Sequence, residues 1–275
     1  MKQLLVAGFG DIARRAAPQL ERAFRVERLA RRFGRDLDRP ETLALAGAHA
    51  VLHCAPPAAT GDTDLRTANL LAALAKAGIL PARIVYVSTS GVYGDCDGEL
   101  VDESRPLEPR SARAIRRVSA ETQLAQWCRP RGVRLIVLRA PGIYAADRLP
   151  LARLRAGRPV LRTEDDVYTN HIHADDLAAI ACRALEDDAP EGAYNVCDDT
   201  RLKMGDWLDL VADTAGLPRP PRVARTALAE ASDFMSESRR LDNRKLKREL
   251  GITLRYPTVH EGLAHAHAVG LDQSA

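Results

Sequence analysis

The sequence predicts an α/β fold built on a doubly wound parallel sheet, and three observations support this prediction. Short apolar runs alternate with helical patterns along the first 140 residues, as in sheets whose two faces are both covered by helices. The first run ends in a glycine turn that leads directly into a helix. The chain of 275 residues is also long enough for one large domain, or for a domain and a half.

The predicted elements of the first half alternate regularly. The apolar runs predict strands at residues 3–7, 25–30, 50–55, 83–90 and 134–140. The patterns between them predict helices at 11–24, 63–77 and 111–129. After Pro141 the pattern changes: TNHIHADDLAAIACRAL leads from a strand into a helix, GAYNVCDD is a further strand, and helices follow at 204–215 and 242–250.

Composition excludes several classes of protein. The net charge is only +3, and only the stretch 105–134 is locally basic, so we expect no nucleic-acid partner. The first apolar run is too short for a signal or a membrane span, so we expect no membrane association. The five cysteines include no C-x-x-C pair, which argues against disulfides and zinc and favours a reducing, cytoplasmic location.

The glycine turn fits the pattern G-x-G-x-x-A, placed between the first strand and the first helix. In that pattern the first glycine permits the tight turn, the second lets a pyrophosphate approach the backbone, and the small third residue allows close packing. A merely structural glycine turn is the alternative. The residues that we assign to the dinucleotide here are Gly8, Gly10, Asp11, Ile12 and Ala13. The carboxylate of Asp11 must then point away from the phosphates.

The end of the second strand predicts which dinucleotide binds. Sites that prefer NAD carry an acidic residue there to hold the ribose hydroxyls. This chain has Arg31 and Arg32 instead, and guanidinium groups suit a 2′-phosphate. We therefore expect NADP, with NAD less favoured, although both arginines could also be solvated loop charges.

The two halves of the chain accordingly have different expected roles. Residues 1–143 and 173–198 are predicted to form a Rossmann-type dinucleotide-binding domain. Residues 144–172 and 199–275 are predicted to form a smaller C-terminal region that binds the substrate.

Several further motifs resemble the extended short-chain dehydrogenase/reductase superfamily, in its NAD-dependent epimerase/dehydratase branch. They are HCAPP, VSTSGVYGD, LRAPGIYAADR, NHIHADD, GAYNVCDD and RRLDNRKLKRELGITLRYPTVHEGL. The resemblance covers nearly the whole chain, with the motifs in the expected order. It specifies the superfamily and leaves the substrate open.

This resemblance implies roles for individual residues. Thr89 matches the active-site Ser/Thr whose hydroxyl binds a substrate oxygen, or it only satisfies backbone groups at the strand end. Sugar dehydratases carry Asp-Glu where this chain has Ser90 and Gly91, so dehydration is disfavoured. The residues expected beside the nicotinamide and its ribose are Ala55, Pro56, Ser88, Pro141, Gly142 and Ile143.

The motif NHIHADD is expected to be structural. Its two histidines, His171 and His173, have no evident third ligand, so no metal site is predicted.

The catalytic Tyr-x-x-x-Lys pair of the family is missing. Aligned on Glu121, Arg113 takes the place of the tyrosine and Arg117 that of the lysine, and no tyrosine lies between residues 94 and 143. Arginine cannot donate or accept a proton at working pH, although Arg117 could still supply positive charge to the ribose. This pattern resembles the atypical subgroup that keeps the nucleotide fold and lacks the pair.

The helical spacing of Arg110, Arg113 and Arg117 predicts one basic face, which either binds an anion or is simply solvated. A replacement proton donor would have to come from elsewhere. Three tyrosines are candidates by location: Tyr93, Tyr144 and Tyr168. Of these, Tyr144 follows a strand into the cleft.

Two functions remain open from the sequence. The first is an NAD(P)-dependent oxidoreductase or epimerase that acts on a nucleotide sugar or another small anionic hydroxyl or carbonyl compound. The second is a non-catalytic NADP-binding redox sensor or regulatory protein. The resemblance also implies a possible homodimer, in which helices 63–77 and 111–129 of two copies form a four-helix interface.

Overall fold

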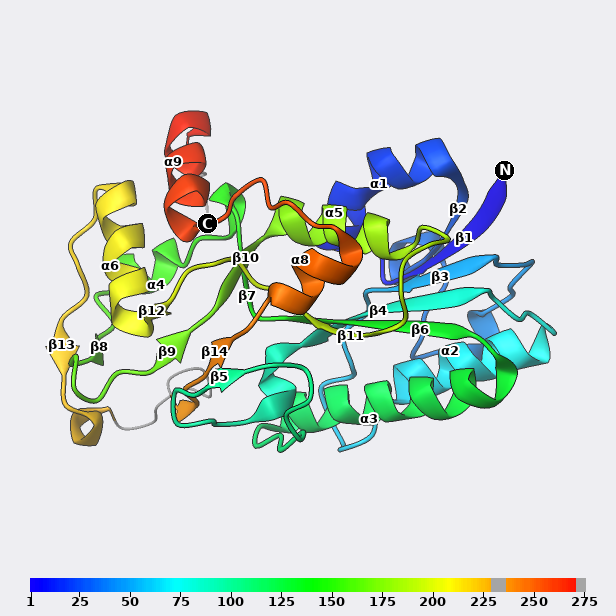
Figure 1. The fold of residues 1–275 in the computed structure, drawn as a ribbon, viewed down its shortest axis with the longest axis horizontal. Helices are drawn as coiled ribbons and strands as arrows, with labels where there is room; N and C mark the ends of the chain where they lie inside the picture. Colours follow the sequence, from blue (N-terminus) through cyan, green and yellow to red (C-terminus); the bar gives the residue numbers. More distant parts are fainter. Residues whose placement is uncertain (229–235, 271–275) are drawn as a thin grey trace.

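The computed structural model describes residues 1–228 and 236–270 and centres on a parallel sheet of six strands (Figure 1). The strands are β1 (Lys2–Ala7), β2 (Phe24–Leu29), β3 (Ala50–His53), β4 (Arg83–Thr89), β6 (Arg134–Ala140) and β11 (Gly192–Asn195). Their order is β11-β6-β4-β3-β1-β2, and every neighbouring pair is parallel. The predicted α/β fold with a parallel sheet is confirmed.

Helices cover both faces of this sheet, which makes it doubly wound. Helices α1 (Asp11–Ala23) and α5 (Ala174–Ala184) lie on one face, and α2 (Leu65–Lys76) and α3 (Ala112–Cys128) lie side by side on the other (Figure 1). Each face buries its own apolar cluster, because the strand residues alternate in direction. Burial of these two clusters is the main stabilising term of the domain.

The strand order reverses between β1 and β3, and the loops that follow these strands lie at the carboxyl edge of the sheet. The Gly8 amide donates to the carbonyl of Leu29 at 2.9 Å, and the amides of Cys54 and Ala55 donate to the carbonyl of Ala7 at 2.8 and 3.0 Å. Ligands of doubly wound sheets bind at such a reversal point. The glycine loop therefore stands where a cofactor is expected.

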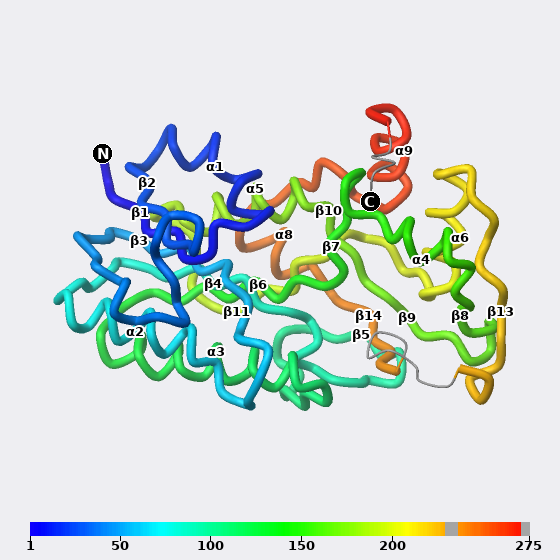
Figure 2. Tube along the Cα trace, turned by 180° about the vertical axis from the view of Figure 1, so that it is seen from behind, coloured from blue at the N-terminus to red at the C-terminus, as the bar shows by residue number. Residues whose placement is uncertain are grey.

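A second region packs beside this edge (Figure 2). It contains the parallel pair β7 (Gly142–Tyr144) and β10 (His171–His173). Two short strand pairs follow: β8 (Val160–Leu161) with β13 (Arg222–Val223), and β9 (Tyr168–Thr169) with β12 (Leu202–Lys203). The helices of this region are α4 (Leu151–Arg155), α6 (Met204–Ala215) and α9 (Val259–Val269). Its core is a separate apolar cluster that includes Tyr144 and Trp207.

The remaining elements connect the two regions. Strand β14 (Arg240–Leu241) pairs with β5 (Leu100–Val101), and α8 (Arg244–Leu250) packs on the sheet core through Leu246 and Leu250. Helix α8 thus belongs by packing to the dinucleotide-binding part, although the predicted boundary assigned it to the substrate region. The two-part division itself stays a prediction.

Two further features bear on the sequence analysis. Among residues 1–228 and 236–270, no helix has the length and apolarity that a membrane crossing requires. Within the same residues, no group of three or more His, Cys, Asp or Glu side chains could hold a metal ion, and the five cysteines are free.

Candidate dinucleotide site and substrate cleft

The glycine loop is shaped for close approach of a ligand. Gly8 has φ +87°, and a Cβ there would lie 2.3 Å from the backbone nitrogen of Ala55, so only glycine fits. Gly10 caps α1 without any side-chain hydrogen bond, and a Cβ on Gly10 would meet nothing within 4 Å. The open amides of the first turn of α1 are suited to bind phosphate.

A cavity of about 340 Å³ runs from this loop past the end of β2 and is lined by Gly8, Gly10, Ala55 and Pro56. The structure thus brings together four of the residues predicted to contact the dinucleotide. Ala13 is instead fully buried against the sheet core, where its small size allows the close helix–strand packing that the motif requires.

The carboxylate of Asp11 turns toward arginines. Its Oδ1 accepts from Arg15 Nε at 3.0 Å, and its Oδ2 accepts from Arg148 Nη1 at 2.9 Å. The orientation of Asp11 relative to a phosphate stays a prediction.

Both arginines after β2 line the same cavity. Arg32 donates to the carbonyl of Phe9 at 2.9 Å, and its guanidinium lies 5.2 Å from the centre of the Phe9 ring. Arg31 is exposed, and its side chain makes no hydrogen bond or close ion pair within residues 1–228 and 236–270. Asp36 also lines the cavity, so both a cation and an anion face the expected adenosine ribose.

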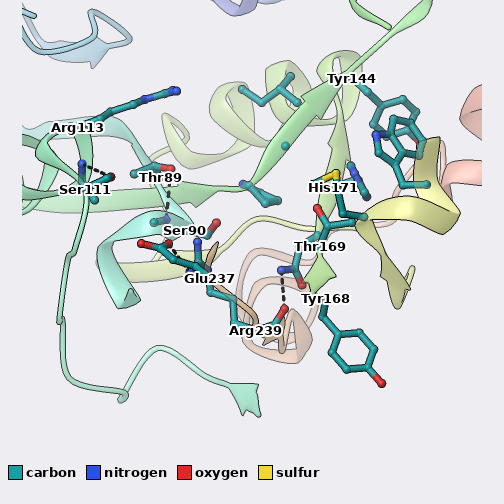
Figure 3. Close-up of a pocket in the computed structure, with 18 of the residues that line it drawn as sticks. Thr89, Ser90, Ser111, Arg113, Tyr144, Tyr168, Thr169, His171, Glu237 and Arg239 are labelled. Carbon is teal, nitrogen blue, oxygen red and sulfur yellow. Dashed lines mark hydrogen bonds and ion pairs between the residues drawn. The ribbon is translucent and has the colours of Figure 1, made fainter. Parts of the chain in front are cut away.

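A larger cavity of about 530 Å³ opens at the carboxyl ends of β4 and β6. Thr89 and Arg113 both line it (Figure 3). The Thr89 hydroxyl oxygen accepts from the amide of Gly91 at 3.3 Å, which leaves its proton free for a ligand. Pro141, Gly142 and Ile143 also line this cavity, and their predicted contact with the nicotinamide stays a prediction.

The side chain of Ser88 is turned toward α3. Its hydroxyl donates to Glu121 Oε1 at 2.5 Å in a buried contact, so only its backbone is left for the predicted contact with a cofactor. The reason is strand alternation, which puts Ser88 on the same face as Tyr86.

The two arginines that replace the catalytic pair differ in environment. Arg113 is exposed in the cleft and has no hydrogen bond or ion pair within the described residues. Partial desolvation by the cleft walls is the main cause that lowers the pKa of Arg113, and the positive charge of Arg117 is the second. The guanidinium still stays protonated. Arg117 is buried and donates to the Tyr86 hydroxyl at 2.9 Å and the Val87 carbonyl at 2.8 Å.

The expected basic face is only partly formed. Ser111 caps α3 by accepting from the amide of Ala114 at 3.2 Å, so Arg110 precedes the helix. Arg110 pairs with Asp95 at 3.4 Å. Of the three arginines, Arg113 alone lines the cleft.

Glu121 is the centre of a buried network behind the cleft. It pairs with Arg139 at 2.9 Å, and both side chains are only 8% exposed. Arg139 also donates to the Tyr93 hydroxyl at 2.9 Å, and that hydroxyl donates to Asn195 at 2.8 Å. Tyr93 is therefore committed to the core, and its pKa is raised to about 12 mainly by burial.

Tyr144, the predicted proton donor, lines the substrate cavity (Figure 3). Its ring is edge-on to His171 and Trp207, and its hydroxyl donates to the carbonyl of Thr258 at 3.4 Å. A Cβ on Gly262 would lie 2.2 Å from this hydroxyl, which shows that the phenol reaches α9. Burial raises the pKa of Tyr144 far above its usual value, and its role as a proton donor stays a prediction.

Sequence reasoning missed much of the cavity wall, including an ion pair and a buried histidine. Glu237 and Arg239 form a buried ion pair at 2.8 Å, and no motif pointed to Glu237. His171 packs on Trp207 with ring centres 4.2 Å apart, and neither ring nitrogen has a hydrogen bond within the described residues. Burial lowers the pKa of His171 to about 3, so the cavity holds a neutral imidazole.

The other histidine of the motif is structural. His173 Nδ1 accepts from the amide of Asp175 at 3.2 Å and caps α5. Asp176 accepts from the amides of Arg255 and Tyr256 at 2.7 and 3.0 Å and fixes the chain before α9. These contacts explain the motif without a metal.

A parallel α/β sheet with an open glycine loop at its reversal point defines a dinucleotide-binding protein. The sequence profile of the NAD dependent epimerase/dehydratase family matches residues 26–197. The chain belongs to this family.

Curated relatives are similar over part of the chain. A 3-diazoavenalumate denitrifying reductase of Streptomyces is 30% identical over 226 residues, which are 76% of this chain and 73% of the relative. The GDP-6-deoxy-D-mannose reductase of Pseudomonas aeruginosa is 28% identical over 170 residues, which are 55% of this chain. The match spans only about half of the Pseudomonas enzyme, 54% of its length.

Solved structures match along nearly the whole chain. A conserved protein of Silicibacter pomeroyi has a TM-score of 0.79 at 30% identity and covers 98% of this chain and 100% of its own. RMD of Pseudomonas aeruginosa, complexed with NADPH, has a TM-score of 0.75 at 21% identity, over 97% and 99% of the two chains. MoeE5, in complex with UDP-glucose and NAD, scores 0.76 at 22% identity, over 97% of each chain. The family and the glycine loop together support a nicotinamide dinucleotide as the cofactor.

Proposed function

We propose that this protein is an NAD(P)H-dependent reductase that transfers a hydride to a small anionic substrate in a cleft without the usual tyrosine and lysine. The observation that carries the proposal is the pair of cavities along one edge of the sheet. One cavity contains the glycine loop, and the other contains Thr89 and an unpartnered Arg113. Reductases among the curated relatives support this reaction class.

The dinucleotide, when bound, supplies the hydride. The Thr89 hydroxyl donates to a substrate oxygen, because its own oxygen already accepts from Gly91. Arg113 offsets negative charge on the substrate. Arg117 keeps one terminal nitrogen without a partner among the described residues and would hold the ribose, as the family lysine does.

The missing phenol limits the substrate. Reduction of a carbonyl creates an alkoxide, whose proton must here come from water or from the substrate itself. An electron-poor anionic substrate whose reduction leaves no alkoxide suits the cleft better, and the denitrifying reductase among the relatives supports this class. A nucleotide-sugar-like carbonyl compound is the other class, supported by the mannose reductase.

We propose NADP rather than NAD as the preferred cofactor. Arg31 lines the cavity without a side-chain hydrogen bond among the described residues, and a guanidinium binds a 2′-phosphate well. Asp36 in the same cavity favours the ribose hydroxyls of NAD, so the choice depends on which of these two side chains contacts the ribose.

A non-catalytic NADP-binding sensor is the second candidate. It is favoured by the hydrogen bond of Tyr144, whose hydroxyl already donates to the carbonyl of Thr258. It shares the dinucleotide site with the reductase and differs only in turnover.

Thermal unfolding with NADPH or NADH, followed by NADPH oxidation, separates these functions. Saturation at about one hundred times Kd should add about 2.7 kcal/mol of stability, with NADPH more effective than NADH. The oxidation panel contains nucleotide-sugar ketones and aromatic diazo carboxylates. Stabilisation without oxidation would support the sensor, and no stabilisation by either dinucleotide would refute both functions.

We also propose a homodimer through α2 and α3, which lie side by side on one face (Figure 1). Leu65 at the start of α2 is 60% exposed, which suits burial between two copies. Sedimentation would reveal a monomer if the proposed interface is wrong.

The free cysteines support a cytoplasmic location.

A further inference from the structure

A cluster of ion pairs joins the glycine loop to the substrate cavity. Asp11, the first residue of α1, binds Arg148 at 2.9 Å and Arg15 at 3.0 Å. Arg15 also binds Asp147 at 2.6 Å and Asp175 at 2.8 Å. The start of α1, the segment after β7 and the start of α5 therefore meet in one network.

Arg148 belongs to both sites. It lines the substrate cavity, and its guanidinium binds the carboxylate of the residue that follows Gly10. The amides of this first turn are where a pyrophosphate would bind. The guanidinium is therefore adjacent to the expected pyrophosphate and to the expected substrate.

Arg148 is the less constrained arginine of the cluster. Its side chain is 36% exposed and makes one hydrogen bond within the described residues, to Asp11. Arg15 is 22% exposed and is held by three carboxylates. Arg15 thus anchors the 146–148 segment through Asp147, while Arg148 keeps free N–H groups for an added anion.

The position of Asp11 would otherwise be unfavourable. A carboxylate beside a pyrophosphate repels it, unless a cation lies between the two. Arg148 is long enough to keep its contact with Asp11 and present its other nitrogen to a phosphate, since a guanidinium offers five N–H groups in a planar fork.

We propose that Arg148 binds the pyrophosphate of the dinucleotide and that this contact fixes one wall of the substrate cavity. The inference rests on the dinucleotide site of the proposed function. It adds a binding residue outside the glycine motif and a coupling between the two sites.

Calorimetric titration with NADP+ tests the contact in the wild type, R148A, R148K and the control R158A. Arg158 is an exposed arginine of the next loop and lines neither cavity. We expect R148A to lose about tenfold in affinity, the usual weight of a charge-assisted hydrogen bond, R148K to lose less, and R158A to match the wild type. Adenosine 2′,5′-bisphosphate, which lacks the pyrophosphate, should bind wild type and R148A alike.

Tryptophan fluorescence tests the coupling. The chain has two tryptophans, so a W127F background leaves Trp207, which lines the substrate cavity. Saturating NADP+ should change the Trp207 emission in W127F and leave it unchanged in W127F/R148A.

The outcomes separate this inference from the proposed function. If the wild type binds NADP+ and R148A binds it within twofold, the inference is overturned and the dinucleotide site stands. Equal fluorescence changes in W127F and W127F/R148A overturn the coupling. If the wild type binds neither NADP+ nor NAD+, the proposed function fails, and this inference fails with it. Circular dichroism melting of R148A confirms that the variant is folded.

Discussion

Replacing Gly8 by alanine should reduce both stability and dinucleotide binding. The new Cβ would lie 2.3 Å from the nitrogen and 2.5 Å from the Cα of Ala55, and the backbone has φ +87°. The left-handed conformation costs about 1–2 kcal/mol for a non-glycine residue, and overlap inside a packed site costs about 1–3 kcal/mol more. We therefore expect a loss of about 2–5 kcal/mol in the free energy of unfolding.

Substitutions at two other glycines separate the cost of the left-handed backbone from the cost of the overlap. Gly132 has φ +66° with open space around its Cβ, so G132A should cost about 1–2 kcal/mol of strain alone and keep NADPH binding. At Gly10, with φ −84°, a Cβ meets no protein atom within 4 Å. G10A should stay within about 0.5 kcal/mol of the wild type and lose NADPH affinity, because its methyl group occupies the pyrophosphate position.

Urea unfolding and calorimetric titration with NADPH measure both quantities for each variant. The overlap argument is refuted if G8A is as stable as G132A. The assignment of the glycine loop is refuted if G10A binds NADPH as tightly as the wild type does.

Three further predictions use other parts of the molecule. Glu121→Ala leaves the buried Arg139 unpaired and should cost about 3–5 kcal/mol by urea unfolding; a loss below about 1 kcal/mol would contradict the network. Burial raises the pKa of Asp198 to about 7, so the folded protein holds this proton more tightly than the unfolded chain. The stability of the wild type relative to Asp198→Asn should therefore fall by about 3 kcal/mol between pH 5 and pH 8, and a pH-independent difference would argue against it. Arg31→Ala should weaken NADPH binding about tenfold without changing NADH binding, and equal losses for both would remove the case for NADP.

The sheet and the glycine loop were predictable because both depend on local patterns. Buried parallel strands form continuous apolar runs, and the first of them leads directly into G-x-G-x-x-A, the loop that the structure places at the reversal point. The position of Thr89 at the end of β4 followed from the same alternation of strands and helices.

The walls of the substrate cavity were not predictable, because they depend on contacts between distant segments. The sequence predicted that Tyr144 enters the cleft. In the structure its hydroxyl also reaches α9, because Gly262, 118 positions later in the chain, leaves space for it there. Glu237 reaches the cavity through contacts of its segment with a distant one, in which Asp95 accepts from the Ser238 amide at 2.8 Å and β14 pairs with β5. The orientation of Ser88, in contrast, was predictable from the sequence. Side chains alternate along β4, so Ser88 lies on the same face of the sheet as Tyr86.

Transfer of deuterium from NADPH labelled at C4 tests the central claim most directly. The account predicts that the wild-type protein forms a product carrying one deuterium from the panel of anionic substrates. It also predicts that Thr89→Val and Arg113→Met slow this transfer by about 10- to 100-fold without loss of NADPH binding. A product that forms without deuterium, or NADPH that binds and is never consumed, would contradict hydride transfer in this cleft.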